Sequence, residues 1–226
     1  MTGAPSTAAE LRPPPQLFRL GRRPDPVAWP SPLSLGSPAR DRFDDPDRKV
    51  RVLYASESEY GCFLEIAARF RPAPGLLQQL RQYGEGEMPA TGLIPASEFQ
   101  QRVLGTFAVS PDAAAGERFL DLRATQTLTH LRDAMAPAAA RAGLDPWELE
   151  RSDAMGRNRR LTQEIARWAL SQGYRGLAYE SRWAQEVTHW ALFHPLELER
   201  GPFRAVDPRA DPAVDRALSV LGVRLG

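Results

Sequence analysis

The sequence predicts an α+β fold built on a mixed, mainly antiparallel sheet. Segments that alternate like strands and segments with helical spacing follow one another, without the regular strand–helix–strand rhythm of a parallel sheet. The chain has 226 residues, 42% of them hydrophobic, which is enough for one packed core. We expect one folded domain over residues 16–226. Residues 1–15, which are rich in Pro, Ala and Ser, are expected to form a disordered tail.

The first part of the chain predicts two strands and one helix. Strands are expected at Gln16–Leu20 and at Lys49–Ala55, where apolar and polar residues alternate. A helix should begin directly after the second strand. Ser56 and Glu59 have the spacing of a capping box, with Ser56 as the N-cap, and Pro72 should end that helix.

The remaining segments continue the mixture of strands and helices. The Pro-rich stretch Arg22–Arg40 fits neither type, and a loop of this length is often functional. The later expected elements are a short helix Leu76–Tyr83, strands Arg102–Val109 and Arg118–Leu122 around a turn at Pro111–Gly116, a helix Thr125–Ala136, a helix Leu161–Gln172 capped by Gly173, and strands Gly176–Tyr179 and Val187–Phe193.

Charge and composition exclude several classes of protein. The net charge of +1 is too balanced for nucleic-acid binding through bulk charge. No apolar run is long enough to span a bilayer, and the first residues lack the apolar stretch of a secretory signal. The single cysteine, Cys62, cannot form an intrachain disulfide. We therefore expect a cytoplasmic protein that contacts neither a membrane nor nucleic acid directly.

The common catalytic motifs are also missing. One cysteine and three histidines offer no CxxC or HExxH spacing, so no metal site is expected. A phosphate-binding Walker loop, a GxGxxG turn after a strand and a GxSxG elbow are all absent. What remains is a dispersed set of polar residues at the boundaries of the expected elements.

Four of these residues have an ordinary structural explanation. Arg19, within an apolar strand, would be costly to bury unless it is paired, but it could also point to solvent. Arg42 precedes an Asp-Pro turn and could simply be solvated. Tyr54, near the end of a strand, is most often a core residue, and Ser181 could be a strand-exit turn residue.

Glu65 lies on the expected helix, about 150° from its apolar stripe at 100° per residue. From periodicity alone, a solvated glutamate that pairs with Arg69 one turn later is the simpler interpretation. A functional role requires that this second face of the helix line a cleft.

The order of these residues and their flanking strings resembles the RES-domain family, which is named after a recurring Arg, Glu and Ser. The resemblance covers about Phe18 to Pro195. It departs from many relatives at Asp41, where they have Gly, and at Ala191–Phe193, where they have an Asn-containing strand end. The matching strings are Phe18-Arg19, Asp41-Arg42-Phe43-Asp44-Asp45-Pro46, Val52-Leu53-Tyr54-Ala55, Phe63-Leu64-Glu65, Gly173 to Arg182, and Ala191-Leu192-Phe193-His194-Pro195.

The resemblance implies a compact relative of the ADP-ribosyltransferase fold. It also implies a toxin of a toxin–antitoxin pair, which depletes NAD by breaking its nicotinamide–ribose bond through hydrolysis or phosphorolysis. NAD is then a substrate, and no cofactor or metal is implied. The implied partner is a helical, Xre-like antitoxin, for which the Arg22–Arg40 loop and the segment after Pro195 are candidate contact surfaces. Whether the chain forms a homo-oligomer stays open.

Carried over to this chain, the family's site implies catalytic roles for Glu65, Arg42 and Ser181. Glu65 would stabilise the positive charge that develops on the ribose. Arg19 and Arg42 would hold the pyrophosphate, Tyr54 would pack against the nicotinamide, and Ser181 would bind a hydroxyl or a phosphate oxygen. Two alternatives stay open: an ADP-ribosyltransferase that modifies a macromolecule, and a non-catalytic binding module of the same fold.

Overall fold

The computed structural model describes residues 8–31, 38–71 and 92–226. Within these residues, the main sheet has seven strands in the order β5-β6-β7-β2-β1-β4-β8, and β3 pairs with β9 in a small second sheet. The strands are β1 Leu17–Arg22, β2 Val52–Ser56, β3 Leu93–Ile94, β4 Arg102–Val109, β5 Arg118–Asp121, β6 Tyr174–Glu180, β7 Thr188–Phe193, β8 Leu198–Ala205 and β9 Arg224–Leu225. The helices are α1 Glu59–Ala67, η2 Ala68–Phe70, α3 Ser97–Gln100, α4 Pro111–Gly116, α5 Thr125–Ala134, α6 Ala136–Arg141, η3 Pro146–Glu148, α7 Arg151–Ala154, α8 Arg159–Ser171 and α9 Pro212–Leu221.

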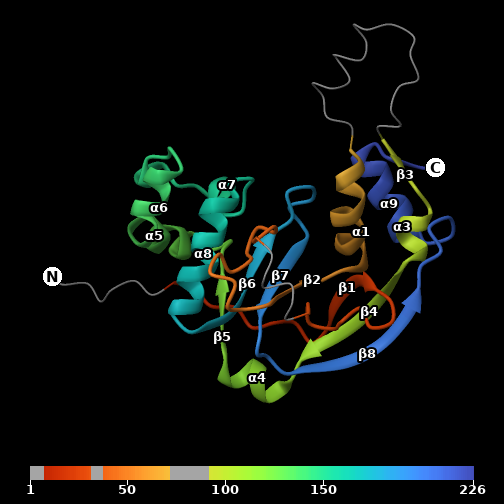
Figure 1. Ribbon diagram of the computed structural model, residues 1–226, viewed down its shortest axis with the longest axis horizontal. Coiled ribbons are helices and arrows are strands. Elements are labelled where there is room, and N and C mark those ends of the chain that lie inside the picture. Colours follow the sequence, from red (N-terminus) through yellow and green to blue (C-terminus); the bar gives the residue numbers. More distant parts are fainter. Residues whose placement is uncertain (1–7, 32–37, 72–91) are drawn as a thin grey trace, which may run out of the picture.

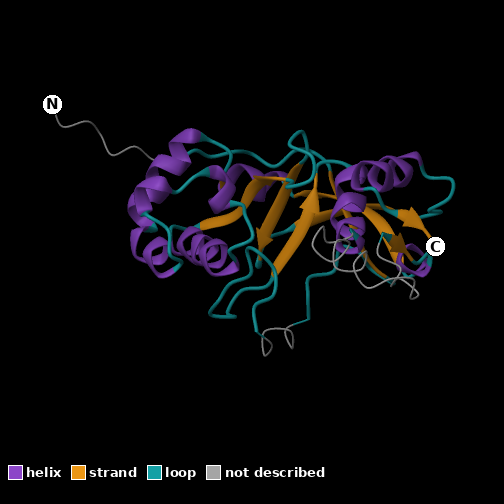
Figure 2. Ribbon diagram, turned by 90° about the horizontal axis from the view of Figure 1, so that it is seen from above, coloured by secondary structure: helices purple, strands orange, loops and turns teal. Residues whose placement is uncertain are grey.

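All pairings within the main sheet are antiparallel except that of β5 with β6, so the expected mixed, mainly antiparallel sheet is confirmed. Two groups of helices lie at opposite ends of it (Figures 1 and 2). Helices α5, α6, α7 and α8 gather beside β5 and β6, whereas α1, α3 and α9 lie beside β1 and β4. Each group encloses an apolar cluster of its own against the sheet. The central strands β2 and β7 therefore lie between the two groups.

The central strand β2 has unequal neighbours. It pairs with β7 along its whole length, from Val52 opposite Phe193 to Ser56 opposite His189. With β1 it pairs at one position, Phe18 opposite Ser56. The two strands therefore diverge beyond this point, and polar side chains can enter the sheet between them.

Helix α1 begins two residues later than the sequence predicts. Its N-cap is Ser58, whose hydroxyl accepts a hydrogen bond from the Gly61 N–H, so the expected N-cap at Ser56 is wrong. Ser56 instead remains in the β2 ladder opposite His189. Its buried hydroxyl accepts from the Ser58 N–H, so both serines shape the strand-to-helix turn.

Gly61 lets helix α1 approach the sheet very closely. A Cβ atom at this position would lie 2.1 Å from the Ser56 Oγ and 2.6 Å from a Val187 methyl group. Such distances are far inside van der Waals contact, so any larger residue would force the helix outward. Glu65 lies one turn further along the same face, because residues four apart in a helix stack over one another. The close contact at Gly61 therefore brings Glu65 toward the strands.

Several expected elements need correction. The segment Pro111–Gly116 is a short helix and not a turn, with Ser110 as its N-cap and Pro111 in its first turn. The strands on either side of it, β4 and β5, lie far apart in the sheet. Strand β8 was not predicted, because nearly all its residues are exposed and Gly201-Pro202 interrupts any alternation. Pro72 and the expected helix Leu76–Tyr83 lie outside the described residues.

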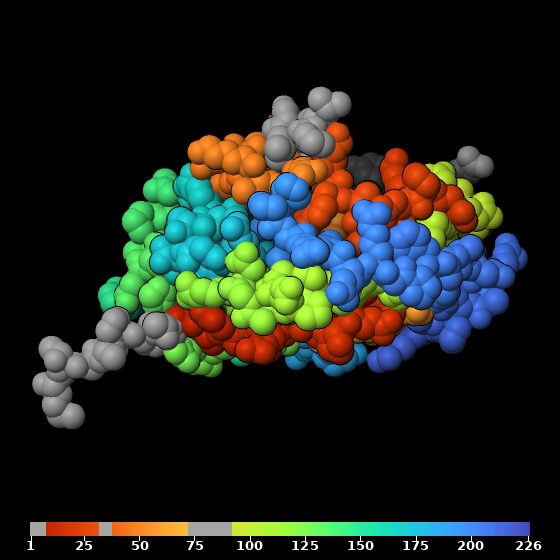
Figure 3. All heavy atoms as spheres, turned by 90° about the horizontal axis from the view of Figure 1, so that it is seen from below, coloured from red at the N-terminus to blue at the C-terminus, as the bar shows by residue number. Residues whose placement is uncertain are grey.

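The N-terminal segment joins the fold earlier than expected. Ala8 is buried, Glu10 forms a bridge with Leu120, and the Leu11 N–H donates to the Phe119 carbonyl. Seen from below, the red N-terminal part of the chain runs along the yellow-green segment around β4 and α4 (Figure 3). The described residues from Ala8 onward thus belong with the sheet, although the tail was expected to extend to residue 15.

Candidate functional site

The carboxylate of Glu65 lies between a cation and an imidazole. Its Oε1 is 3.4 Å from the Arg42 Nη2 and 3.4 Å from the His189 Nε2. The Glu65 side chain is 35% exposed, so the group is partly shielded from water yet open to a ligand. Within the described part of the chain, Glu65 forms no ion pair with Arg69, the partner that periodicity favours. The second face of helix α1 is therefore turned toward other polar groups.

Arg42 links three parts of the molecule. One Nη donates to the Met155 carbonyl at 3.0 Å, the other contacts Glu65, and the guanidinium lies 4.8 Å from the centre of the Tyr179 ring. Its side chain is only 10% exposed. The contacts join the loop before β2 to helix α7, helix α1 and strand β6. Arg42 is thus held in one orientation, with its charge beside the Glu65 carboxylate.

His189 is buried on β7, where it lies opposite Ser56 of β2 and Tyr179 of β6. Desolvation is the main cause that lowers its pKa, and the nearby Arg42 lowers it further. The Glu65 carboxylate and a hydrogen bond to the Ala55 backbone act in the opposite direction but do not overcome the burial. The imidazole is therefore neutral at neutral pH, and its contact with Glu65 is not an ion pair.

Tyr54 and Arg19 line the place where β1 and β2 diverge. The Tyr54 hydroxyl accepts a hydrogen bond from the Phe43 N–H and donates one to Asp44. Burial raises the pKa of Tyr54 well above its ordinary value, so the phenol keeps the proton that it donates. Arg19 donates to the carbonyls of Pro26 at 2.9 Å and Tyr54 at 2.6 Å. Burial lowers the pKa of its guanidinium. Arg19 and Tyr54 thus use most of their hydrogen bonds to hold the neighbouring loops in place.

Ser181 follows β6 directly and lies two residues after Tyr179. Its side chain is buried, its Oγ accepts from the Trp183 N–H at 3.2 Å, and its own N–H donates to the Val187 carbonyl. These contacts shape the turn between β6 and β7. The hydroxyl proton remains available to donate, but within the described structure Ser181 makes no contact with Glu65.

Positive charge gathers around this cluster. Desolvation is the largest cause that lowers the pKa of Arg182, followed by the neighbouring charges of Arg42, Arg157 and Arg159. Among the described residues, neither Arg157 nor Arg182 forms an ion pair. These side chains can therefore attract an anionic ligand toward Glu65.

The sequence analysis missed His189, Tyr179 and Arg182 as members of this cluster. His189 was considered only as a metal ligand, yet the strand alternation places it on the same face of β7 as Ala191. The strand register identifies the neighbours of His189: Tyr179 of β6 pairs with it on one side, and Ser56 of β2 pairs with it on the other. Pairing between distant strands was needed to find this signal.

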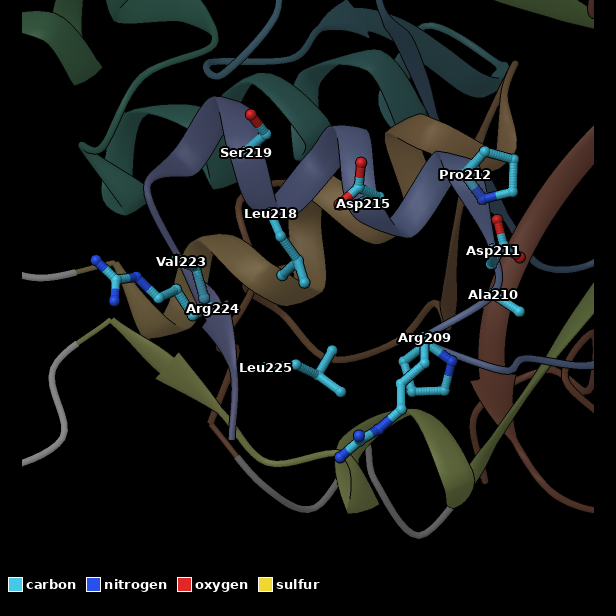
Figure 4. A pocket seen from close by; sticks show the side chains of 11 residues that line it. Arg209, Ala210, Asp211, Pro212, Asp215, Leu218, Ser219, Val223, Arg224 and Leu225 are labelled. Atoms are coloured by element: carbon cyan, nitrogen blue, oxygen red, sulfur yellow. The ribbon is translucent and has the colours of Figure 1, made fainter.

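A separate hollow of about 550 Å³ lies beside α9 and β9 (Figure 4). Of the described residues that line it, none belongs to the Glu65 cluster. Arg209 and Arg224 are balanced there by Asp211 and Asp215. The hollow therefore lacks the excess positive charge that surrounds Glu65.

In residues 8–31, 38–71 and 92–226, no helix is both long enough and apolar enough to cross a membrane. Within the same ranges, no group of three or more His, Cys, Asp or Glu side chains is arranged to hold a metal ion.

Comparisons with known proteins point to one family. The sequence model of the RES domain matches residues 16–212, which is most of the chain. Among solved structures, the chain is similar to a chain of the M. tuberculosis MbcT–MbcA toxin–antitoxin complex. The TM-score is 0.55 at 12% sequence identity, with 93% of this chain and 92% of the other covered, so the likeness is one of fold. A comparison with curated proteins finds no match.

Proposed function

The chain belongs to the RES-domain family, and we propose that it cleaves the nicotinamide–ribose bond of NAD as the toxin of a toxin–antitoxin pair. The observation that carries the proposal is the Glu65 carboxylate, which is partly exposed and lies between Arg42 and His189. The same fold in a chain of a toxin–antitoxin complex adds support. An ADP-ribosyltransferase-like fold is part of the same proposal.

The proposed reaction breaks one bond and needs no metal. The bond between the nicotinamide nitrogen and the ribose breaks, its electron pair leaves with nicotinamide, and positive charge develops on the ribose. Because nicotinamide begins as a cation in NAD, it departs as a neutral molecule. Water, which loses a proton as it does so, or phosphate then bonds to the ribose carbon, giving ADP-ribose or its phosphorylated form.

Glu65 supplies the main electrostatic contribution in this proposal. A fixed carboxylate stabilises a developing cation more than the uncharged ground-state ribose, and this difference lowers the barrier. Arg42 keeps the carboxylate in place and limits its freedom to turn toward solvent. The arginines around the cluster, Arg157, Arg159 and Arg182, would attract the pyrophosphate. Arg182 interacts electrostatically with both Arg42 and Glu65. Tyr54 and Ser181 stay proposed contacts for nicotinamide and for a hydroxyl or phosphate oxygen.

Substitution of Glu65 by Gln tests this role. The amide keeps the shape and removes the charge, so we expect NAD cleavage to fall on the order of a hundredfold or more. NAD affinity should change much less, because the charge is needed mainly in the transition state. The measurement is kcat and NAD affinity, with melting temperature to check the fold. Glu186→Gln is the matched control, since Glu186 is 61% exposed and pairs only at the surface with Arg216.

The products separate the proposed reaction from its alternatives. Free nicotinamide with ADP-ribose, or with phosphorylated ADP-ribose when phosphate is added, supports NAD cleavage to a small acceptor. ADP-ribose attached to protein or nucleic acid would instead identify a transferase. No turnover at high protein concentration would leave a binding module. A Glu65→Gln variant that cleaves NAD at the wild-type rate would remove Glu65 from the mechanism.

An inhibitory protein partner follows from the same proposal. Free NAD cleavage would harm the host cell, so we propose that an Xre-like antitoxin covers the site, in contact with the Arg22–Arg40 loop or the segment after Pro195. The second segment includes strand β8, which is exposed along its length at the edge of the sheet. Expression of the chain alone should slow growth, and co-expression of a neighbouring gene product should restore it. Harmless expression of a folded, abundant product would contradict toxicity.

A further inference from the structure

The imidazole of His189 carries an unsatisfied nitrogen inside the candidate site. The side chain is 3% exposed, and its Nε2 has no hydrogen-bond partner within the described structure. The Glu65 Oε1 lies 3.4 Å away, but the arrangement is not a hydrogen bond. Buried polar atoms almost always form hydrogen bonds in folded proteins, so Nε2 is expected to bond to a group from outside the protein.

The position of the ring proton determines what kind of partner is missing. The contact with the Ala55 backbone raises the pKa, as an accepting carbonyl does, so we assign the ring proton to the nitrogen that faces Ala55. Because Nε2 has no hydrogen-bond partner, we take that nitrogen to be Nδ1. A neutral imidazole has only one N–H, so Nε2 presents a lone pair. The lone pair and the nearest oxygen of the Glu65 carboxylate are then two acceptors that lie 3.4 Å apart.

Two acceptors 3.4 Å apart require hydrogen-bond donors between or beside them. Neither the Arg42 guanidinium, which is already bonded to Met155, nor the Tyr179 ring supplies a donor to Nε2. The two hydroxyls of a vicinal diol can do so, one toward each acceptor. The ribose of NAD carries such a diol, and Glu65 is the group proposed to face that ribose.

We propose that His189 contacts the substrate directly, its Nε2 accepting a hydrogen bond from a hydroxyl of the ribose that Glu65 faces. This inference rests on the proposed function and deepens it, because it makes the site selective for a ribose over a deoxyribose. The selectivity arises in binding: without the hydroxyl, the buried Nε2 stays unpaired beside the carboxylate.

The experiment compares NAD with two analogues that lack the 2′- or the 3′-hydroxyl of the nicotinamide ribose. Their dissociation constants are measured with the wild-type protein and with two variants. His189→Asn places its amide near the Nδ1 position, where it can still bond to Ala55, but leaves no atom at the Nε2 position. His189→Gln extends an amide to that position and restores an acceptor. If the Asn variant does not fold, His189→Phe keeps the ring volume without either nitrogen.

The expected result is that the wild-type protein binds one of the two analogues roughly three- to tenfold more weakly than NAD. The Asn variant should bind NAD and that analogue nearly equally, and the Gln variant should recover part of the preference. Equal binding of all three compounds by the wild-type protein would overturn the inference. So would an Asn or Phe variant that keeps the full wild-type preference.

A different result would identify a failure of the underlying proposal. If the wild-type protein binds no NAD, both the proposed function and the role of His189 are wrong. If NAD is bound and cleaved but the hydroxyls make no difference, only the role of His189 is wrong.

Discussion

Replacement of Arg42 by Ala should lower both the stability of the fold and the affinity for NAD, and the two effects can be measured separately. The side chain is 10% exposed, and its removal leaves the Met155 carbonyl without its charged donor. A hydrogen bond to a charged group contributes about 1.5–3 kcal/mol. The pair with Glu65 adds little, about 0–1 kcal/mol, because that carboxylate is partly exposed and screened. Release of the buried charge offsets some of the loss.

The net destabilisation should therefore be about 1–3 kcal/mol of unfolding free energy. For a domain of this size, that lowers Tm by about 2–12 °C. If the guanidinium also holds the NAD pyrophosphate, the affinity should fall about ten- to a hundredfold. Thermal unfolding gives the first quantity, and titration with NAD at a temperature where both proteins are folded gives the second.

Arg151→Ala is the matched control. Arg151 lies on nearby helix α7 and pairs with Glu180, but its side chain is 45% exposed. Its loss should cost less than about 1 kcal/mol. An Arg42→Ala variant as stable as this control would refute the argument from burial. Unchanged NAD affinity in a folded Arg42→Ala variant would refute the pyrophosphate contact.

Three further predictions concern the surrounding residues. Tyr54→Phe should lower the unfolding free energy by about 1–3 kcal/mol, because the Phe43 N–H loses its acceptor; chemical denaturation measures this, and wild-type stability would contradict it. Arg182→Ala should weaken NAD binding and make it less sensitive to salt, whereas an unaltered salt dependence would place Arg182 outside the ligand's reach. Because the pKa of His189 is lowered in the folded state, this histidine takes up a proton at a higher pH in the unfolded chain than in the folded chain. Stability should therefore decline as the pH falls below about 6.5 and level off below the folded-state pKa. His189→Gln should reduce this decline in denaturation curves at pH 5.5 and 7.5, and an identical decline would assign it to other groups.

The local sequence predicted single elements better than their arrangement. Helix α8 and strand β4 follow directly from periodicity, and Gly173 takes the left-handed conformation expected after α8. The N-cap of α1 was misplaced because Ser56 and Ser58 are both suitable caps, and the choice depends on how far β2 extends along β7. That pairing joins residues far apart in the chain, which no local pattern reveals.

The candidate site shows the same division. Glu65 and Arg42 were identified through the resemblance to a family, whereas periodicity alone favoured a solvated Glu65 paired with Arg69. Two tertiary features make the difference: the close approach at Gly61 and the position of His189 on a strand that pairs with β2. Neither can be read from the sequence near residue 65. The roles of Arg19, Tyr54 and Ser181 stay predictions, because the hydrogen bonds that these side chains make are those of structural residues.

The unequal pairing of strand β2 has a consequence for the newly synthesised chain. On a ribosome, β1, β2 and helix α1 emerge early, but β2 then has only its single position of pairing with β1. Its long edge stays open until β7, more than a hundred residues later, has been translated. The same late strand delivers His189 to Glu65. A polypeptide released before residue 188 would thus lack one wall of the cluster, and the cluster is complete only after β7 has been made.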